Sequence, residues 1–374
     1  MERPPVVILS GVRWDFLWQR HQDLATLFSR AGYPTVFVET TGLANPHPNR
    51  ETLRKVASRL SRAGGEGSSA EEGLTVYSPL TAPPTYGVFR WLNRRFFVPR
   101  VVKDLGKNAD PVVIAYPPTR TTLEVISGLH PRLVLYDCSD DYAHFPGAPR
   151  DIAATERELL RRADLVSCTS TWLLEKVRAV RPDAFLSGPA VDYEHFAILQ
   201  NIPPPSDGEV RTVCFFGSLS RERIDLCALR AIAEAGFEVR IVGGLRRVGR
   251  DLLELPGIDY RGEVPHAKLP SALAGVDAFV LPYRVNGLTR GISPAKTYEC
   301  LATGRPVVAA PLSALEELAG FVYLAARPRD YVEVLQSLKN LETERGRRAR
   351  IELARGNSWG ARFEEIEEAL WRIL

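Results

Sequence analysis

The sequence predicts an α/β protein made of two successive halves. Short apolar runs rich in Val, Ile and Phe alternate with longer segments of helical periodicity, and a Pro-rich bridge interrupts this alternation once. The apolar runs are continuous instead of alternating with polar residues, which is typical of parallel strands covered by helices on both faces. A chain of 374 residues is also too long for one ordinary core and suits two domains.

The first half contains seven predicted strands joined by helical segments. Two clear helices are expected at residues 16–31 and 151–163, so the repeating units are of the βαβ kind. The predicted strands are residues 6–11, 35–40, 75–80, 111–116, 133–138, 165–170 and 184–189.

The second half begins after the Pro-rich bridge. We expect an N-terminal domain over residues 1–196, a linker over 197–210 and a C-terminal domain over 211–357. An amphipathic segment, 358–374, follows. The predicted strands of this half are residues 212–218, 237–243, 258–264, 278–283, 306–311 and 321–325.

Composition excludes several classes of protein. Hydrophobic residues make up 45% and charged residues 25%, as in soluble globular proteins, and the net charge of +3 is too small to indicate nucleic-acid binding. Five cysteines without a C-x-x-C pair favour reduced thiols, and the histidines show no zinc spacing, so we expect no metal. No signal peptide or stretch of about 18 apolar residues is present, which predicts a cytoplasmic location.

Two basic segments leave a second location open. One lies at residues 50–62 and the other at residues 87–107, on either side of a predicted Gly/Ser/Glu-rich loop at 61–73. The second segment also carries aromatic residues, and a basic helix with an aromatic face can lie in an anionic membrane surface. The alternative is a helix that buries its aromatics on the sheet and leaves its arginines in solvent.

The segment after the first strand is a candidate acceptor or phosphate loop. Ligands of open α/β sheets bind beyond the carboxyl ends of the strands, and Gly11, Arg13 and Arg20 follow the first strand directly. A glycine there allows backbone N–H groups to approach an anion, although most such turns are structural. No G-x-G-x-x-G follows, which disfavours a dinucleotide cofactor.

Three carboxylates lie at the C-terminal end of the fifth predicted strand. Asp137, Asp140 and Asp141 fall within five residues, which is costly unless the groups are solvated, paired or used in chemistry. Asp140 or Asp141 could act as a general base, as a helix cap, or as part of an Asp-x-Asp-like metal site. These three interpretations stay open at this point.

Two motifs of the second half suit a diphosphate ligand. Gly217, Ser218 and Arg221 follow its first strand, where N–H donors and Arg charge can hold phosphate, although a plain β–α turn would have the same composition.

The stronger motif spans residues 286–308 and begins with a Gly-rich approach that includes Thr289. Ser293 and Pro294 start a helix, since Pro suits the first helical turn. Glu299 follows Lys296 by three residues and therefore shares its face of the helix, where a carboxylate can accept two ribose hydroxyls.

This motif resembles the donor-binding region of GT-B glycosyltransferases, where P-x-K-x-x-E-x-x-A-x-G-x-P-V-V recurs, and especially family 4-like and teichuronic-acid or capsular polysaccharide transferases. The resemblance implies two Rossmann-like domains facing across a cleft, with the final helix crossing back to the first domain. It also implies that Lys296 and Glu299 hold the donor diphosphate and ribose, and that the loop around Val264 contacts the base.

One departure from the family pattern concerns the mechanism. Retaining members usually carry a glutamate eight residues before the ribose-binding one, and Gly291 occupies that position here. The resemblance then favours an inverting transferase that needs no metal and whose base, Asp140 or Asp141, lies in the first domain.

The sequence thus predicts a glycosyltransferase that moves a sugar from a nucleotide diphosphate-sugar to a hydroxyl of a saccharide, lipid-linked or small-molecule acceptor. Chemistry is expected after hinge closure, which excludes water. A nucleotide-sugar 2-epimerase of the same fold and a non-catalytic binding subunit are the alternatives. The epimerase would need a second set of acid/base carboxylates, and the subunit would leave Asp140 and Asp141 without a role.

Overall fold

The chain folds into two compact units. The structure, a computed structural model, describes residues 3–15, 18–39, 68–79, 81, 87–106, 110–145, 147–202, 209–246 and 248–374. Unit 1 comprises Met1–Ser187 with Phe363–Leu374, and unit 2 comprises Gly188–Arg362. The basic segment 50–62 lies outside the described residues.

Unit 1 is built on one sheet, which has eight strands within the described residues, in the order β3-β4-β2-β1-β5-β6-β7-β8. All neighbours are parallel except β3 and β4. The strands are β1 (Val6–Leu9), β2 (Thr35–Val38), β3 (Ser68–Glu71), β4 (Leu74–Tyr77), β5 (Val112–Ala115), β6 (Leu133–Cys138), β7 (Leu165–Cys168) and β8 (Phe185–Leu186).

The continuous apolar runs form the central strands, as predicted. Every residue of β1, β5 and β6 is buried, because helices cover both faces of a parallel sheet. Strand β3 lies where we expected a loop: its backbone pairs with β4, although its composition is poor in strand formers. That part of the predicted loop 61–73 is therefore wrong.

The helices of unit 1 connect these strands and include a segment from the far end of the chain. They are α1 (Arg20–Arg30), α3 (Gly87–Leu92), the π-helical turn η1 (Asn93–Phe97), α4 (Val98–Leu105), α5 (Arg120–Leu129), η2 (Tyr142–His144), α6 (Ile152–Arg162) and α7 (Thr171–Arg178). Helix α16 (Trp359–Trp371) belongs to unit 1 from Phe363 onward. Phe363 packs edge-on against Phe28, with 5.0 Å between the ring centroids. The Tyr33 hydroxyl donates to Glu367 at 2.7 Å and accepts from the Trp371 indole at 2.9 Å.

Unit 2 has a parallel sheet in the order β13-β11-β9-β14-β15-β16 within the described part of the chain. Numbered along the chain this is the doubly wound order 3-2-1-4-5-6, so the winding reverses between β9 and β14. The strands are β9 (Thr212–Phe216), β11 (Glu238–Val242), β13 (Ile258–Gly262), β14 (Ala278–Leu281), β15 (Val307–Ala309) and β16 (Tyr323–Leu324), with a separate pair β10 (Leu219–Ser220) and β12 (Leu245–Arg246).

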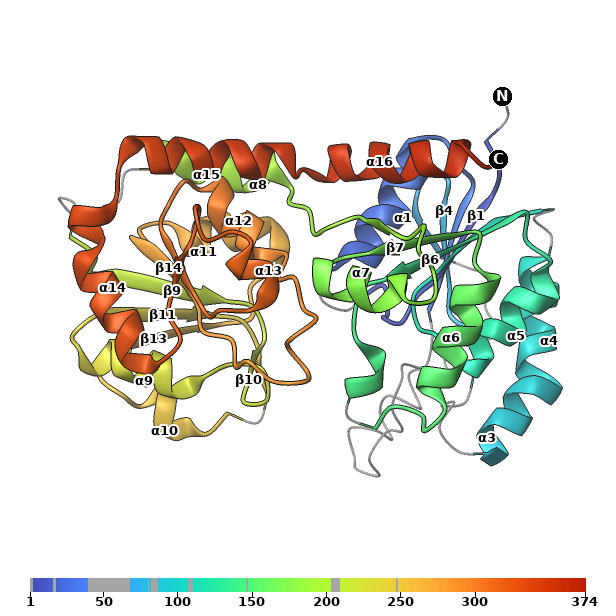
Figure 1. Cartoon of the computed structure of the whole chain (residues 1–374), viewed down its shortest axis with the longest axis horizontal. Coiled ribbons are helices and arrows are strands. Elements are labelled where there is room, and N and C mark those ends of the chain that lie inside the picture. Colours follow the sequence, from blue (N-terminus) through green and yellow to red (C-terminus); the bar gives the residue numbers. More distant parts are fainter. Residues whose placement is uncertain are drawn as a thin grey trace. The chain divides into compact units, whose positions relative to one another are not determined.

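Helices cover both faces of the unit 2 sheet (Figure 1). Helices α8 and α15 contact α12 on one side, and α14 contacts α9 on the other. The helices are α8 (Tyr193–Ala197), η3 (Ile198–Asn201), α9 (Leu226–Glu234), α10 (Arg250–Leu253), η4 (His266–Lys268), α11 (Leu269–Leu273), α12 (Lys296–Ala302), α13 (Ser313–Glu316), α14 (Pro328–Leu341) and α15 (Glu344–Gly356).

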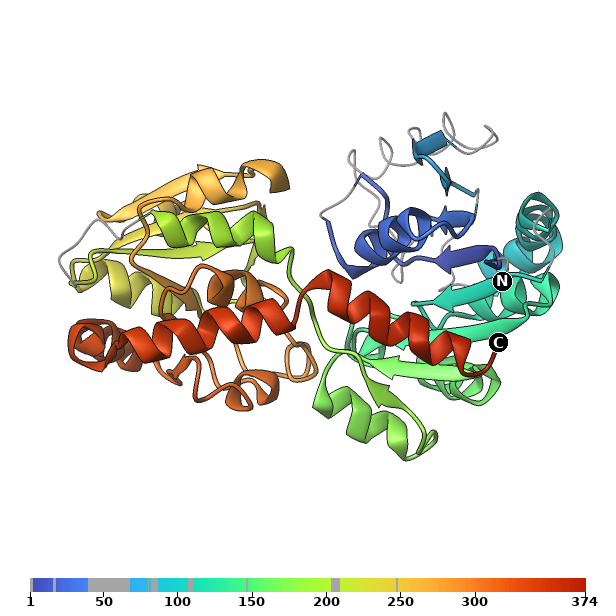
Figure 2. The same ribbon diagram turned by 90° about the horizontal axis from the view of Figure 1, so that it is seen from above.

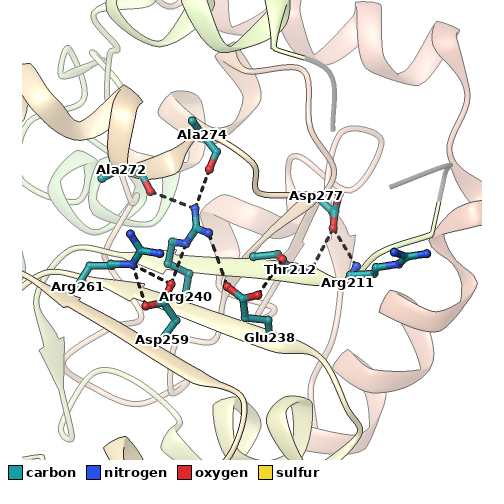
Figure 3. Close-up of polar contacts among 9 residues, drawn as sticks. All are labelled: Arg211, Thr212, Glu238, Arg240, Asp259, Arg261, Ala272, Ala274 and Asp277. Carbon is teal, nitrogen blue, oxygen red and sulfur yellow. Dashed lines mark hydrogen bonds and ion pairs between the residues drawn. The ribbon is translucent and has the colours of Figure 1, made fainter. Parts of the chain in front are cut away.

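A polar network ties the connection between α11 and β14 to the strands (Figure 3). Arg240 on β11 donates to the carbonyls of Ala272 and Ala274, at 3.3 and 2.7 Å, and bonds Asp259 on the neighbouring strand at 3.2 Å. Asp277 accepts the backbone N–H groups of Arg211 and Thr212, both at 2.9 Å. These bonds satisfy backbone groups that the strand ladders leave unpaired.

The boundary between the units falls between Ser187 and Gly188. From the sequence we predicted that the first domain ends at residue 196. Val191 exchanges backbone hydrogen bonds with Asn357 and Trp359, and Phe196 and Leu199 are buried in the unit 2 core. The first residues of the expected linker 197–210 are therefore helical and packed. At the other end, the segment assigned to unit 1 starts at Phe363 and not at residue 358.

Candidate functional site

The donor motif lies at the point where the unit 2 sheet reverses its winding. Strands β9 and β14 are neighbours there, and their carboxyl ends lead to Gly217 and Tyr283. Ligands of doubly wound folds bind at such a switch point, because the loops on either side diverge. From the strand order, a ligand is therefore expected at the carboxyl ends of β9 and β14.

Lys296 lies directly against the backbone of Gly217. A Cβ atom on Gly217 would meet the Lys296 Nζ at 2.6 Å, and Gly217 has a φ of +112°, so only glycine fits here without moving the lysine. Burial lowers the pKa of Lys296, but the neighbouring Tyr283 and Glu299 together raise it by a larger amount. The pKa of Lys296 is therefore above its ordinary value. The ammonium therefore presents a fixed positive charge at the switch point.

Glu299 sits one turn further along α12 and is half-buried. Burial raises its pKa from 4.5 to about 7, against the lowering effect of Lys296 and with a further increase from Asp192. A carboxyl group with a pKa near 7 is costly to ionise unless donors approach it. Two ribose hydroxyls are donors of that kind.

Glycines shape the rest of this edge. A Cβ on Gly243 would lie 2.0 Å from the carbonyl oxygen of Gly217, and Gly243 donates its N–H to Gly262 at 2.7 Å. The carboxyl ends of β9, β11 and β13 therefore approach one another closely, because glycines leave only backbone atoms between them. Val264 follows Gly262 and packs partly buried against the unit 2 core, which leaves the loop before η4 well anchored.

The other predicted donor residues have different surroundings. Ser218 has a buried hydroxyl with no hydrogen-bond partner among the described residues, next to Gly217. Arg221 is exposed at the start of the turn after β10. Ser293 is half-buried and Pro294 is buried; Ala295, the residue after Pro294, caps α12, so the helix begins two residues after the proline.

Thr289 braces the loop instead of facing solvent. Its side chain is fully buried, its hydroxyl donates to the carbonyl of Arg284, and it accepts the N–H of Asn286 at 3.1 Å. The Asn286 side chain in turn accepts the N–H groups of Leu288 and Thr289 at 2.9 and 3.2 Å. These bonds give the Thr289 side chain a structural role in the loop, and its predicted part in donor binding stays a prediction.

Unit 1 has its own switch point, between β1 and β5. His21 stacks on Tyr116 there, with 3.5 Å between ring centroids, and its Nδ1 lies 2.8 Å from the Ser10 hydroxyl. Burial lowers the pKa of His21 to about 3, so the imidazole is neutral. Gly11 lies beside this stack, in ordinary contact with His21 and Pro117.

Arg20 forms a buried ion pair that the sequence did not indicate. Its guanidinium bonds the Asp137 carboxylate at 2.6 and 3.2 Å and the Ser187 hydroxyl at 2.9 Å, and Ser167 donates to the same carboxylate at 2.8 Å. Asp137 is fully buried. Arg20 therefore holds the strands of unit 1 together through its Nε and Nη2 atoms, a structural role beside which its predicted place in an acceptor or phosphate loop stays a prediction.

Asp141 is bound in a second network. Its two oxygens lie 2.7 Å from the Lys176 Nζ and 2.6 Å from the His144 Nδ1, and Lys176 also contacts Glu156 at 3.3 Å. The Tyr136 hydroxyl completes the network by donating to Glu156 at 2.9 Å. This pairing favours a structural role for Asp141, since both of its carboxylate oxygens are engaged by neighbouring side chains.

Asp140 and Arg13 remain nearer to solvent. Asp140 is half-buried at the carboxyl edge of β6, where its charge raises the pKa of Tyr142 in addition to the larger effect of burial. Arg13 pairs with Asp15 on the segment after β1 and is also half-buried. In the described part of the chain, no three His, Cys, Asp or Glu side chains gather in a metal-binding arrangement.

Comparison with known proteins identifies the family that part of the chain matches. Residues 210–342 match the family described as glycosyl transferases group 1, and all the unit 2 donor residues lie within that match. A teichuronic acid biosynthesis glycosyltransferase of Bacillus subtilis (strain 168) is 24% identical over 260 residues, which are 62% of this chain and 65% of the relative. Residues 210–342 therefore carry a glycosyl transferases group 1 domain, and the whole chain has the GT-B fold.

Solved structures share the fold over the whole chain. Sucrose-phosphate synthase from Thermosynechococcus elongatus aligns with a TM-score of 0.66 and 14% identity over 99% of both chains. A glycosyltransferase from Rickettsia africae ESF-5 gives a TM-score of 0.66 with 12% identity, over 100% of this chain and 99% of that one. At such identities the likeness shows the fold alone, which confirms the predicted pair of Rossmann-like domains.

Two functional candidates, His21 and Tyr116, were missed from the sequence. They meet Asp137 at the unit 1 switch point, although the three residues come from different parts of the chain. The sequence signal for this cluster was Asp137, an ionisable residue inside the otherwise apolar strand β6. Its partner could not be named, because pairing across a sheet depends on strand order.

Proposed function

We propose that this GT-B glycosyltransferase moves a sugar from a nucleotide diphosphate-sugar, bound by unit 2, to a hydroxyl group of an acceptor bound by unit 1. The observation that carries the proposal is the lysine held over Gly217 at the switch point, with Glu299 one turn away. A fixed cation beside bare backbone suits a diphosphate, and a carboxyl group poised near neutral pH suits ribose hydroxyls.

Two further contacts support the donor assignment. The buried hydroxyl of Ser218 has no hydrogen-bond partner among the described residues, and Ser218 directly follows Gly217, against whose backbone Lys296 lies; a phosphate oxygen bound at this turn would satisfy the hydroxyl. Arg221 is exposed nearby along the chain and carries a charge of the required sign. Val264 holds the loop that we assign to the nucleotide base.

For catalysis we propose Asp140 as the general base. Asp141 is engaged by Lys176 and His144, which leaves Asp140 as the carboxylate of this pair nearer to solvent. Gly291 supplies no carboxylate near the donor motif, and this favours an inverting transfer in which Asp140 takes the proton from the acceptor hydroxyl. Asp140 is then the only member of the pair whose removal should affect chemistry more than folding.

The experiment replaces each aspartate by asparagine after the donor has been found by thermal shift with a panel of nucleotide diphosphates and their sugars. Asp140→Asn should lower kcat by about 10²–10⁴-fold without changing donor affinity. Asp141→Asn should instead lower the free energy of unfolding by about 1–3 kcal/mol, because Lys176 loses a buried charged partner, while the folded fraction keeps its turnover. Full activity in Asp140→Asn would exclude it as the base.

We propose a saccharide acceptor, because the curated relative is named for teichuronic acid biosynthesis. The family match and this relative are both glycosyltransferases, so the epimerase alternative gains no support. A binding subunit remains distinguishable, since it would bind the donor yet show no turnover with any acceptor.

We also propose that α3, η1 and α4 contact an anionic membrane surface. Val88, Trp91 and Phe96 are 62%, 58% and 52% exposed, whereas Val98 and Val101 bury the next turns. Trp91 and Phe96 thus extend into solvent, which supports this proposal over burial of the aromatics on the sheet, while Phe89 and Phe97 are half-buried. These helices lie at the periphery of unit 1 in both views (Figures 1 and 2). No helix in the described residues is long and apolar enough to cross a membrane.

A further inference from the structure

Two tryptophans follow β1 and form an aromatic pair anchored on the unit 1 sheet. The Trp14 ring meets Phe37, which is fully buried in β2, with 5.1 Å between centroids and 75° between planes. Trp18 then meets Trp14 edge-on, at 5.4 Å and 70°. The outer ring is therefore connected to the core through two ring contacts.

Hydrogen bonds fix both residues. The Trp14 backbone N–H donates to one Glu39 oxygen at 2.6 Å, and Ser78 donates to the other oxygen at 2.6 Å. The Trp18 indole N–H donates to Asp23 on α1 at 2.7 Å. Trp18 nevertheless keeps 42% of its surface exposed. An oriented aromatic face left in solvent loses little conformational entropy on binding, which suits it to contact a ligand.

The pair lies on the segment that leaves the carboxyl end of β1, next to the switch point of unit 1. Gln22 of α1 donates to the Arg13 carbonyl at 3.2 Å and so fastens this segment to the helix that carries His21. Ligands of doubly wound folds bind at this edge. The aromatic face is therefore placed where an acceptor would be expected.

The charges around Trp18 decide whether its exposed face suits a membrane surface or a sugar. Asp23 places a carboxylate at the indole N–H of Trp18, and the positive charge of Arg13 on the same segment is offset by Asp15, so this face does not favour an anionic membrane surface. The exposed aromatics of α3 and η1, in contrast, have Arg94 and Arg95 as neighbours. A pyranose has an apolar C–H face that can cover the indole and hydroxyl groups that can donate to carboxylates. A carboxylate at the edge of an exposed aromatic ring thus matches a sugar.

We propose that the exposed indole face of Trp18 binds a pyranose ring of the acceptor, with Asp23 as a hydrogen-bond acceptor at its edge. This inference rests on the proposed function, because it assigns the acceptor class and its subsite. Trp18 is then a specificity residue for the acceptor and contributes nothing to nucleotide binding.

The test uses the full chain labelled with 5-fluorotryptophan and observed by fluorine NMR. Trp18→Phe and Trp91→Phe assign two resonances, and Trp91 is the matched control because it is 58% exposed and lies in a basic setting. A panel of methyl pyranosides (glucoside, galactoside, mannoside and N-acetylglucosaminide) is titrated, and anionic vesicles are added in a separate series.

We expect the Trp18 resonance to shift saturably with at least one methyl pyranoside while the Trp91 resonance stays unchanged. In transfer assays, Trp18→Ala should raise the acceptor KM by roughly tenfold and leave donor affinity unchanged. No Trp18 shift with any pyranoside, or a Trp18 response only to vesicles, would overturn the inference. Absence of nucleotide-sugar binding would instead refute the proposed function, and the pyranoside titration would still stand on its own.

Discussion

Glu299 shows how one residue can couple burial to donor binding. Its pKa of about 7 is set first by burial, with Asp192 adding to the increase and Lys296 opposing it. Between pH 4.5 and 7 the folded protein therefore binds more protons at this group than the unfolded chain, so its contribution to stability falls as pH rises through that window. A donor that hydrogen-bonds the ionised carboxylate reverses this cost.

We therefore expect affinity for the nucleotide diphosphate-sugar to rise between pH 6 and pH 8, because more of Glu299 is ionised before binding. Isothermal titration at several pH values measures this dependence. Glu299→Gln should bind more weakly, by about tenfold, with a dependence that is flat across the same range. An unchanged pH dependence in Glu299→Gln would show that another group titrates.

The turn after β9 shows how an element prepares a site. Gly217 continues the strand into a positive-φ turn, which leaves room for the Lys296 side chain against its backbone. Gly236, in the turn after α9, has a similar positive φ of +94°, but a Cβ there would have no atom within 4 Å. The two glycines thus share a backbone requirement and differ only in what lies beside them.

Gly217→Ala and Gly236→Ala should both lower the free energy of unfolding by about 1–2 kcal/mol, because both place a Cβ in the positive-φ region. Only Gly217→Ala should also weaken donor binding, since its methyl group displaces the Lys296 ammonium. Chemical denaturation and nucleotide titration of the two variants separate the effects. Equal donor affinity in both variants would mean that the position of Lys296 does not depend on Gly217.

At the scale of the whole molecule, α3 and η1 form a surface region where exposed aromatic and basic side chains coincide. Trp91 and Phe96 lie among arginines on α3 and η1, whereas Val285 of unit 2 is 56% exposed without such a cluster. Apolar insertion and attraction to anionic lipid act together on a surface of this kind.

We expect the protein to float with vesicles that contain anionic lipid, and to float less as salt increases, because screening weakens the attraction of the arginines. Trp91→Ser combined with Phe96→Ser should reduce flotation, while Val285→Ser, the matched control, should not. Equal flotation with neutral vesicles would contradict the electrostatic part of this proposal.

The sequence by itself determined the strands and the donor motif. Continuous apolar runs predicted the parallel strands of both sheets, and the spacing of Lys296 and Glu299 placed them on one helix face, because both signals depend only on neighbouring residues. The tertiary structure decided what each charged group contacts. Arg20 meets Asp137 across 117 positions, and Asp141 meets Lys176 across 35, so Arg20 and Asp141 have structural contacts that the sequence did not indicate. Such pairs depend on strand order and burial, which local patterns do not encode.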